Sequence, residues 1–578
     1  MPTPQASLQA AVPEVIVIDG CYSDASSVTL GIEPDDSERR IIDLTPDKEI
    51  NDGDYLTDEA YERWLQGLYN EAQQAVAVQP SRPARPEKRC LPEVYLNGIV
   101  YKAGQSMELT DGTFLRVEKV LADREAEIWF RGRRLLRTQH HKEVYIPKWT
   151  FELVWIAMEK VDIAVHRVKK FVCIHFTNYC HIDQDDKKRK HPWDLFCRIK
   201  EHHGGKKNPS SVEYLTYEEA DEGFRYDPAM LRLNWRGQTK PFGAFERSPV
   251  VDLVDDAAPP RHDPEIQQMK SSRQYTFGDA FCGAGGMSCG AREAGLRIEW
   301  ACDNTRHAVD SYRSNYADAL VWHSDIYNFL HVDDSPVVDV LHASPPCQTF
   351  SPAHTIVSNN DDANSACIFS CSNLLQKSKP RVITMEETSG LFERHKDTFN
   401  RLILDFIDIG YAVRWGVLNC VQYGVPQLRR RLVIIASGPG DALPPFPKPT
   451  HGLPGSGLPG FVTIHQAISG IPPGASHHDV ARALARGPSQ APLDGNGQIG
   501  TITCGGGELN THPDGNRTLT NREYACLQTF PVLYHFCPPR VRQQIGNAVP
   551  PKMAEALYKE IIRVLQQTDE RESSKISA

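Results

Sequence analysis

The sequence lacks the long apolar runs and the N-terminal signal that membrane and secreted proteins carry. No stretch of its 578 residues reaches the roughly twenty apolar residues that a membrane-spanning helix needs, so we expect no membrane partner. The chain starts without a charged segment followed by an apolar core, and we expect no secretory signal. Its 15 cysteines are therefore expected to be reduced thiols in the cytosol or nucleus rather than a disulfide framework.

The chain also has fewer basic than acidic side chains, 64 against 74. The net charge is −10, and residues 1–80 carry 16 acidic and only 4 basic side chains, which leaves the other 498 residues at +2. An acidic chain argues against a broad nucleic-acid-binding surface. A local basic patch on the folded part would still bind phosphates strongly.

The chain is too long for one hydrophobic core, and composition divides it into segments. Residues 1–90 are acidic and interrupted by prolines, which is typical of disorder. Short alternating strands separated by glycine turns predict a β-rich domain over 91–235. A polar, proline-bearing stretch at 236–272 is expected to be a linker.

Residues 273–565 alternate apolar strands with helix-length segments, which predicts an α/β fold with a mostly parallel sheet. Within it, residues 437–515 are rich in proline and glycine and are expected to form a small loop-rich subdomain. A four-residue apolar spacing near the end predicts a closing helix, followed by a disordered tail at 566–578.

The first expected strand of this region ends in a glycine-rich turn, Phe281-Cys282-Gly283-Ala284-Gly285-Gly286. Such a turn lets a ligand approach the backbone and exposes the amides that open the next helix, although glycines also form purely structural turns. Asp303 follows the next strand at the distance where an acidic residue holds ribose hydroxyls. Because the turn is not GxGxxG, a single nucleoside-type cofactor is favoured over a dinucleotide.

Three further segments place reactive side chains after expected strands. Cys347 lies in the proline-held loop Ser344-Pro345-Pro346-Cys347-Gln348, at the edge where open α/β sheets put their chemistry. Glu386 ends an apolar run, although an isolated glutamate there is more typical of a helix cap or an ion pair. Arg429 and Arg431 alternate in an extended segment, so both can face one site, unless the run is simply a solvated basic edge.

These motifs, in this order, resemble those of the DNA (cytosine-5)-methyltransferases. The resemblance covers roughly residues 273–565. It rests on the motifs DAFCGAGG, Asp303, the SDI tripeptide, SPPCQTFS, MEETSGL, GVPQLRRR, the segment 517–531 and QIGNAVPP. It implies a Rossmann-like S-adenosylmethionine-dependent methyltransferase sheet with a small target-recognition region.

The resemblance implies a role for each catalytic residue. Cys347 matches the nucleophile that attacks the cytosine ring beside carbon 5, and a free thiol with a pKa of about 8.5 must be activated for this. Glu386 matches the residue that bonds the ring nitrogen and exocyclic amine. Arg431 matches the arginine that holds the cytosine carbonyl oxygen, and Arg429 the one that supports the catalytic loop.

The resemblance also implies binding residues for the methyl donor, S-adenosylmethionine, and for double-stranded DNA. The cofactor residues are expected to be Phe281, Gly283, Gly285, Gly286, Asp303, Asp325, Ile326 and Asn547. The residues expected to contact DNA are Gln348, Ser351, Gln427, Arg517 and Arg522. Because the reacting carbons are stacked inside a duplex, the target base must be flipped out at a cost of a few kcal/mol.

The sequence departs from the family pattern in three places. The family's usual Glu-Asn-Val is Glu386-Glu387-Thr388 here, and an inward-facing Glu387 would repel Glu386 and raise its pKa. The position after Asp303, often aromatic, is Asn304, and the target-recognition region is only about 80 residues long. The first and third departures, together with SPPCQTFSPAH, resemble the fungal RID-type subgroup, which acts in premeiotic silencing of repeated DNA.

Residues 95–156 resemble a bromo-adjacent-homology (BAH) domain through the run Phe130–Arg137, the pair Glu143-Val144 and the segment 151–154. Such modules bind histone tails or other chromatin proteins, although a β-domain that only packs on the catalytic unit would have the same pattern. Cys173, His175, Cys180 and His181 have a spacing that fits no zinc pattern, so we predict no metal site.

The resulting prediction is a nuclear enzyme that methylates carbon 5 of cytosine in repeated DNA. Two alternatives stay open. One is a catalytically weak, chromatin-bound silencing factor, which the extra Glu387 and Thr388 would favour. The other is a mutator that leaves attacked cytosines to deaminate to thymine. RNA methylation is less favoured, because a β-rich domain of this kind suits chromatin better than transfer RNA.

Overall fold

The computed structural model describes residues 88–137, 151–157, 162–180, 194–204, 209–237, 274–332, 337–346, 361–504 and 510–577. The acidic segment predicted at 1–90 lies almost wholly outside these residues, as do most of the expected linker and the loop that carries Cys347, Gln348 and Ser351. Of the helices in the described ranges, none combines the length and apolarity that a membrane crossing requires.

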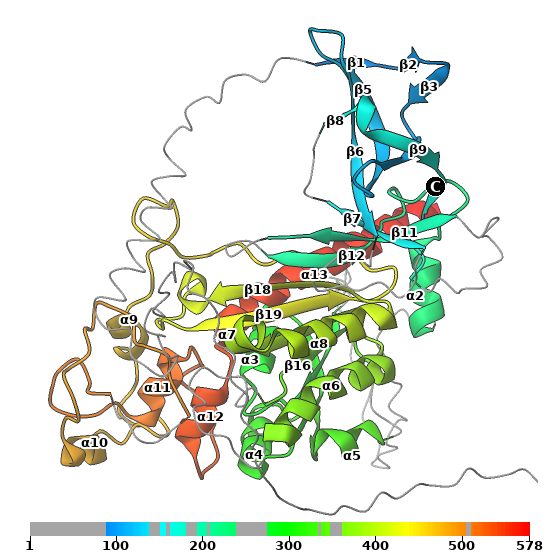
Figure 1. Cartoon of the computed structure of the whole chain (residues 1–578). Coiled ribbons are helices and arrows are strands. Elements are labelled where there is room, and N and C mark those ends of the chain that lie inside the picture. The colour runs from blue at the N-terminus through cyan, green and yellow to red at the C-terminus, as the bar shows by residue number, and fades with distance from the viewer. Residues whose placement is uncertain are drawn as a thin grey trace, which may run out of the picture. The chain divides into compact units, whose positions relative to one another are not determined.

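The C-terminal half is an α/β fold built on a sheet with parallel and antiparallel strands (Figure 1). Its strands are β13 (Thr276–Ala280), β14 (Arg297–Asp303), β15 (Leu320–His323), β16 (Val340–Ala343), β17 (Val382–Glu387), β18 (Ala412–Asn419) and β19 (Arg430–Ser437). Their spatial order is β15, β14, β13, β16, β17, β19, β18. The first five are parallel to one another, and β19 runs antiparallel to both of its neighbours.

Helices cover both faces of this sheet, so its central strands are apolar on both sides and read as continuous hydrophobic runs. One face packs on α5 (Ile326–Leu330), α6 (Asp361–Ser378) and α8 (Lys396–Ile409), through a core that includes Phe329, Ile368 and Leu402. The other face packs on α3 (Gly286–Ala294) and α13 (Pro551–Ser577), through Met287, Met553 and Leu557. This part also contains α4 (Arg306–Asn315) and α7 (Ser389–Arg394).

The N-terminal part is β-rich, and its turns follow from local chemistry. At the tight turn before β5, Gly112 has a φ of 80°, and the Asp111 carboxylate accepts a hydrogen bond from the Thr113 amide at 3.0 Å. The elements are β1 (Arg89–Leu91), β2 (Glu93–Leu96), β3 (Ile99–Lys102), β4 (Ser106–Leu109), β5 (Phe114–Ala122), β6 (Ile128–Arg137), β7 (Glu152–Ile156), β8 (Ile163–Ala164), β9 (Val168–Val172), β10 (Ile174–Phe176), β11 (Leu195–His202), β12 (Ser210–Tyr214) and α2 (Pro228–Arg236).

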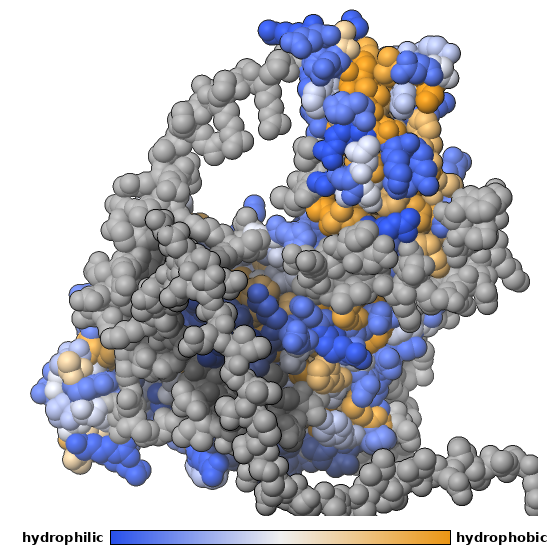
Figure 2. Space-filling model, viewed as in Figure 1, coloured by the Kyte–Doolittle hydropathy of each residue, from blue (hydrophilic) through white to orange (hydrophobic). Residues whose placement is uncertain are grey.

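The β-rich part carries apolar side chains at its surface, between hydrophilic ones (Figure 2). Its exposed large apolar residues include Tyr95, Ile99, Val100 and Phe171. Its last strand does not belong to a separate sheet, because β12 pairs antiparallel with β18 and so continues the catalytic-half sheet. The expected boundary between a β-rich domain and an α/β domain therefore does not interrupt the hydrogen-bonded sheet.

The segment 437–515 contains two short helices, α9 (Ile464–Ile468) and α10 (Val480–Arg486), and no named strand in its described residues. Two more helices follow, α11 (Asn521–Leu527) and α12 (Val541–Asn547). Side chains of α9, α11 and α12 share one apolar core with the residues Cys282 and Ala284 of the glycine-rich turn.

The prediction of a disordered tail at 566–578 was wrong for residues 566–577, which continue α13. Two ion pairs hold this extension. Arg381 contacts Asp569 at 2.8 Å, and Arg232 contacts Glu572 at 2.8 Å. The polar composition of the tail suggested disorder because the sequence does not reveal these partners, which lie far away along the chain.

Candidate active site

The candidate site lies where the strand order of the sheet reverses. β13 is flanked by β14 on one side and by β16 on the other, and the connections to them leave in opposite directions. In open α/β sheets, the carboxyl ends of the strands at such a point form a crevice that binds ligands. Phe281 follows β13 there, Ser344 follows β16, and Glu386 lies at the end of the adjacent β17.

The glycine-rich turn after β13 is shaped by left-handed backbone conformations. Phe281 has a φ of 61° and Gly283 a φ of 54°. A Cβ atom on Gly283 would meet no atom within 4 Å, so the turn is open on this side. The Gly283 amide donates to Asp303 Oδ2 at 2.8 Å, and the Thr305 amide donates to Oδ1 at 2.7 Å.

This arrangement fits a nucleoside-type cofactor. Each Asp303 oxygen accepts one amide and, as a carboxylate oxygen, can accept a second donor such as a ribose hydroxyl. Burial raises the pKa of Asp303, although the two backbone amides oppose the shift. The open space at Gly283 and the partly satisfied carboxylate are the two features that a bound S-adenosylmethionine would use.

The last two glycines of the turn, Gly285 and Gly286, lie close to the C-terminal segment. A Cβ on Gly285, whose φ is 90°, would lie 2.6 Å from the Tyr534 hydroxyl, and one on Gly286 would lie 2.4 Å from the Val549 carbonyl oxygen. Both contacts are too short for a real side chain. These glycines therefore allow the C-terminal segment to pack against the turn, while Gly283 is the one that faces open space.

A glutamate and an arginine meet beside the crevice. Arg431 Nε lies 2.8 Å from Glu386 Oε1, and both side chains are mostly buried. The contact is an ion pair, and Glu386 Oε1 accepts no hydrogen bond from the described residues. Arg430, between the two inward arginines, is exposed and pairs with Glu393 at 3.6 Å, as the alternation predicts.

Glu387 faces the opposite side of β17 and is completely buried. Neither of its carboxyl oxygens has a hydrogen-bond partner among the described residues, and the same holds for the Thr388 hydroxyl. Burial, reinforced by the nearby charge of Glu386, raises the pKa of Glu387 well above its ordinary value. The extra carboxyl of the Glu386-Glu387-Thr388 segment therefore has a raised pKa of its own, because it is withdrawn from water.

Arg429 fastens the C-terminal segment to the sheet. Its guanidinium donates to the carbonyl oxygens of Ile502, Gly546 and Ala548, each at 3.3 Å. Burial and the charge of Arg431 lower the pKa of Arg429 to about 10, so it stays protonated at neutral pH. Asn547 lies between two of these carbonyls and is exposed, and its Oδ1 accepts a contact from Cys504 Sγ.

Comparison with known proteins adds the decisive observation. The sequence model of the family described as C-5 cytosine-specific DNA methylase matches residues 275–455 and 467–563. The type II methyltransferase M.NgoFVII of Neisseria gonorrhoeae is 31% identical over 338 residues, which cover 52% of this chain and 90% of that protein. The type II methyltransferase M1.HphI of Haemophilus parahaemolyticus is 29% identical over 50% of this chain and 87% of that protein.

The chain belongs to the C-5 cytosine-specific DNA methylases. A eukaryotic relative, the DNA (cytosine-5)-methyltransferase PliMCI of Paracentrotus lividus, is 30% identical over 190 residues, which cover 30% of this chain and 12% of that protein. The prediction of a DNA (cytosine-5)-methyltransferase is confirmed. Its methyl donor is S-adenosylmethionine and its substrate is DNA.

Three predicted DNA contacts of this methylase lie in its interior. Gln427 is fully buried and bonds Gln528 and the Ile502 amide. Arg517 is 7% exposed and donates to both carboxyl oxygens of Glu523, at 2.9 and 2.7 Å.

Arg522 is 1% exposed and donates to the carbonyl oxygens of Ser476 and Tyr534, both at 2.8 Å. Gln427, Arg517 and Arg522 thus have their partners within the chain, and their contact with DNA stays a prediction. The Arg517 pair lies after the segment 437–515, and Arg522 links Ser476 of that segment to Tyr534.

The remaining predicted cofactor residues lie at the adjacent strand end. Asp325 caps α5 by accepting the Asn328 amide at 2.9 Å, and Ile326 is buried under the sheet. The Asp325 carboxylate already accepts a hydrogen bond from the helix it caps. It can therefore accept one from an adenine only through its remaining lone pairs. The predicted roles of Cys347, Gln348 and Ser351 stay predictions, since these residues lie outside the described ranges.

One positioning residue of the methylase was not predicted from its sequence. His342 on β16 is buried, and its ring nitrogens bond the Thr384 hydroxyl at 2.9 Å and the Ser344 hydroxyl at 2.6 Å. Burial lowers the pKa of His342 to about 3, so the ring is neutral. It thereby anchors the first residue of the loop that leads to Cys347. The only signal in the sequence was a polar residue inside an apolar strand.

Proposed function

We propose that this enzyme methylates a flipped cytosine through a covalent adduct with Cys347, while Glu386 and Arg431 hold the base. The observation that carries this proposal is the Glu386–Arg431 pair at the carboxyl edge of the sheet, with a carboxyl oxygen that accepts no hydrogen bond from the described residues. Because this ion pair is mostly buried, a polar ligand edge that bonds both groups would be weakly screened by water and held strongly.

The base offers matching groups. The exocyclic amine of cytosine is a hydrogen-bond donor that a carboxylate accepts, and its carbonyl oxygen is an acceptor that a guanidinium can hold. Glu386 and Arg431 thus present one acceptor and one donor side by side, which suits the polar edge of cytosine. Thymine carries a carbonyl in place of the amine, and its oxygen would face the carboxylate unfavourably.

The chemistry begins with the Cys347 thiolate adding to carbon 6 of the ring. The electron pair of the carbon 5–carbon 6 double bond is then available at carbon 5, and the interaction of Glu386 with the ring nitrogen favours this shift. When bound, S-adenosylmethionine supplies an electrophilic methyl group. As carbon 5 takes the methyl group, the carbon–sulfur bond of the donor breaks and a neutral thioether is left. A solvent base then takes the proton from carbon 5, the carbon 5–carbon 6 double bond re-forms, the carbon 6–sulfur bond breaks and the Cys347 thiolate is regenerated.

The biological role that we propose is silencing of repeated DNA in the nucleus. The Glu386-Glu387-Thr388 segment and the short recognition region support membership of the RID-type subgroup. The β-rich part, with strands β4 to β9 and its exposed apolar residues, supports a BAH-like module that contacts a histone tail or another chromatin protein.

A methyl-transfer assay tests the catalytic proposal. With duplex repeat DNA and tritiated S-adenosylmethionine, the wild type should label 5-methylcytosine, and Cys347→Ser should reduce the label by at least about 10³-fold, as expected when a covalent nucleophile is lost. Cys90→Ser is the matched control, because Cys90 is an exposed cysteine in the β-rich part. Label that persists in Cys347→Ser would rule out the covalent route.

A second candidate function is a chromatin-bound silencing factor that turns over poorly. The buried pair Glu387 and Thr388, whose polar atoms find no partner in the described residues, favours it, because such a site is destabilised next to the catalytic glutamate. It predicts that silencing survives Cys347→Ala. The mutator alternative predicts cytosine-to-thymine changes in repeats, which sequencing before and after a cross would detect.

A further inference from the structure

A cysteine, a histidine and an aspartate come together in the β-rich part. Cys173 directly precedes β10 and His175 lies inside it, so the two side chains share one face of the strand. β10 pairs in parallel with β11, and Ile174 lies opposite Leu195. Asp194, which precedes β11, is therefore the neighbour of Cys173 across the ladder. Three residues from two strands meet although the sequence separates Asp194 from His175 by a long segment.

We propose that Cys173, His175 and Asp194 form a zinc-binding site. Cys173 Sγ lies 3.4 Å from His175 Nε2, and His175 Nε2 lies 3.5 Å from Asp194 Oδ2. All three ligand atoms lie within 4.8 Å of one another. Tetrahedral zinc with Zn–S of about 2.3 Å and Zn–N and Zn–O of about 2.0–2.1 Å places neighbouring ligand atoms about 3.3–3.6 Å apart.

A direct His175–Asp194 ion pair accounts less well for the geometry. A charge-assisted N–H···O bond is about 2.7–2.9 Å long, whereas these two atoms are 3.5 Å apart. This separation is what two ligands of the same ion have. The donor set also selects the metal, since a thiolate with an imidazole suits zinc and disfavours magnesium and calcium, which prefer oxygen ligands.

The surroundings hold the ligands in place. The His175 ring stacks on Phe224, with ring centroids 4.3 Å apart and an interplanar angle of 26°. The strand between Cys173 and His175 is fixed because Arg116 donates to the Ile174 carbonyl oxygen at 2.6 Å. The side chain of Asp194 is only 3% exposed, so a cation beside it would be poorly screened by water and held strongly.

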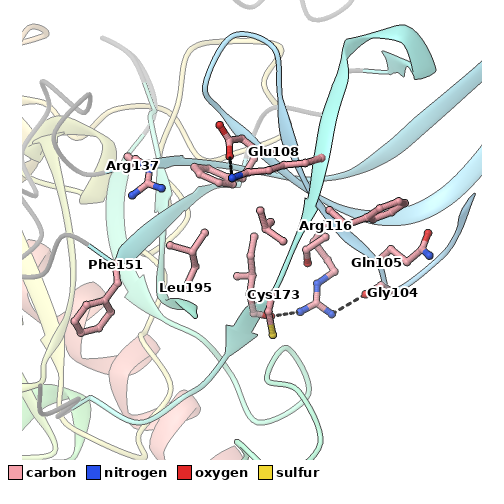
Figure 3. A pocket seen from close by; sticks show the side chains of 14 residues that line it. Gly104, Gln105, Glu108, Arg116, Arg137, Phe151, Cys173 and Leu195 are labelled. Carbon is pink, nitrogen blue, oxygen red and sulfur yellow. Dashed lines mark hydrogen bonds and ion pairs between the residues drawn. The ribbon is translucent and has the colours of Figure 1, made fainter. Parts of the chain in front are cut away.

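The site has an open side. Cys173 is exposed and lines a cavity of about 920 Å³ together with Gly104, Arg116 and Leu195 (Figure 3). A fourth ligand, such as water, can therefore reach the metal from this cavity. We assign the ion a clamping role. It would tie the start of β10 to the start of β11, and its binding would release the thiol proton of Cys173.

Cobalt substitution tests the proposal on the full-length protein, purified without a histidine tag. After chelation and addition of Co²⁺, the wild type should show a thiolate-to-cobalt charge-transfer band that saturates at about one equivalent. Cys173→Ser should lose the band, and Cys90→Ser should keep it. Zinc should raise the melting temperature of the wild type and of Cys90→Ser, and leave that of Cys173→Ser unchanged.

Because Cys173 is exposed, its replacement by serine is not expected to unfold the domain, and unchanged methyl transfer by the variant would show this directly. A band of equal intensity in Cys173→Ser would overturn the proposal. So would a wild type that takes up no cobalt, since the three side chains would then form only a hydrogen-bonded cluster.

Discussion

At the residue scale, the unusual feature is a buried acid next to Glu386, the residue that we propose binds the base. Glu387 is fully buried, and both of its oxygens lack a hydrogen-bond partner among the described residues. Its charged form is disfavoured by burial and by Glu386, so it is expected to remain protonated where an ordinary glutamate has ionised. While Glu387 is protonated, Glu386 has no second negative charge beside it.

Replacing Glu387 by glutamine, which mimics the neutral acid, should change the pH dependence of stability. A raised folded-state pKa means that the folded protein binds the proton more tightly. Its stabilising effect is then complete below the unfolded value near 4.5 and is lost as pH rises toward the folded pKa. The difference between wild type and Glu387→Gln should grow in this window by up to about 1.4 kcal/mol per pH unit, in favour of the variant.

Urea unfolding midpoints measured across this pH range would check the expectation. Glu393→Gln is the matched control, because the side chain of Glu393 is 48% exposed and its variant should differ from wild type by a small, constant amount. A Glu387→Gln difference that does not vary with pH would show that Glu387 ionises normally.

At the scale of elements, a buried ion cluster links the end of the sheet to two helices. Asp441 follows β19 and contacts Arg381 at 2.7 Å and Arg232 of α2 at 3.0 Å. Burial alone would raise the pKa of Asp441, but the two arginines outweigh it and hold that pKa below its ordinary value. The same arginines reach Asp569 and Glu572 of α13, which explains why the polar C-terminal extension is helical.

Asp441→Asn should therefore destabilise the protein by about 3–5 kcal/mol, because it leaves two buried guanidinium groups short of their shared carboxylate. Guanidinium chloride unfolding would measure the loss. The control is Asp310→Asn, which removes an exposed i,i+4 pair with Arg306 and should cost at most about 0.5 kcal/mol. Equal effects of the two variants would mean that the buried cluster contributes no more than a surface pair.

At the scale of the whole molecule, the β-rich part and the methylase part share one sheet within residues 50–578. β12 covers the edge of β18, and Arg414 of β18 pairs with Glu213 of β12 at 3.0 Å. The Tyr214 hydroxyl donates to the Ile407 carbonyl oxygen at 2.6 Å. The β-rich part thus protects a strand edge that would otherwise be free to pair with other chains.

A fragment of residues 274–578 should consequently aggregate, whereas a fragment of residues 88–578 should remain monodisperse. Removal of β12 and α2 exposes the hydrogen-bonding edge of β18 and uncovers the charges of Asp339 and Asp441. Size-exclusion chromatography with light scattering would compare the two fragments. A stable, monodisperse 274–578 fragment would show that β12 is dispensable as an edge cover.

The linear order of motifs was enough to predict the methylase sheet, because each strand of the parallel core is an apolar run followed by a short polar motif. The strands expected before the glycine-rich turn and before Asp303 are β13 and β14, the apolar run that ends at Glu386 is β17, and the extended segment with Arg431 begins β19. β18 was missed, since its alternation is irregular, as was the pairing of β12 with it. Such pairings depend on contacts between residues about 200 positions apart, which local patterns do not encode.

The sequence by itself determined the family, and with it methyl transfer from S-adenosylmethionine to DNA, because the motifs are recognised by their residue types and their order. Only the tertiary structure decided which charged side chains face the site and which are structural. It buried Arg517 and Arg522 against their own chain, withdrew Glu387 from water, and brought Cys173 to Asp194. The physical reason is that tertiary packing decides whether a charged side chain is buried and which group it pairs with. Packing brings together residues that lie far apart in the sequence.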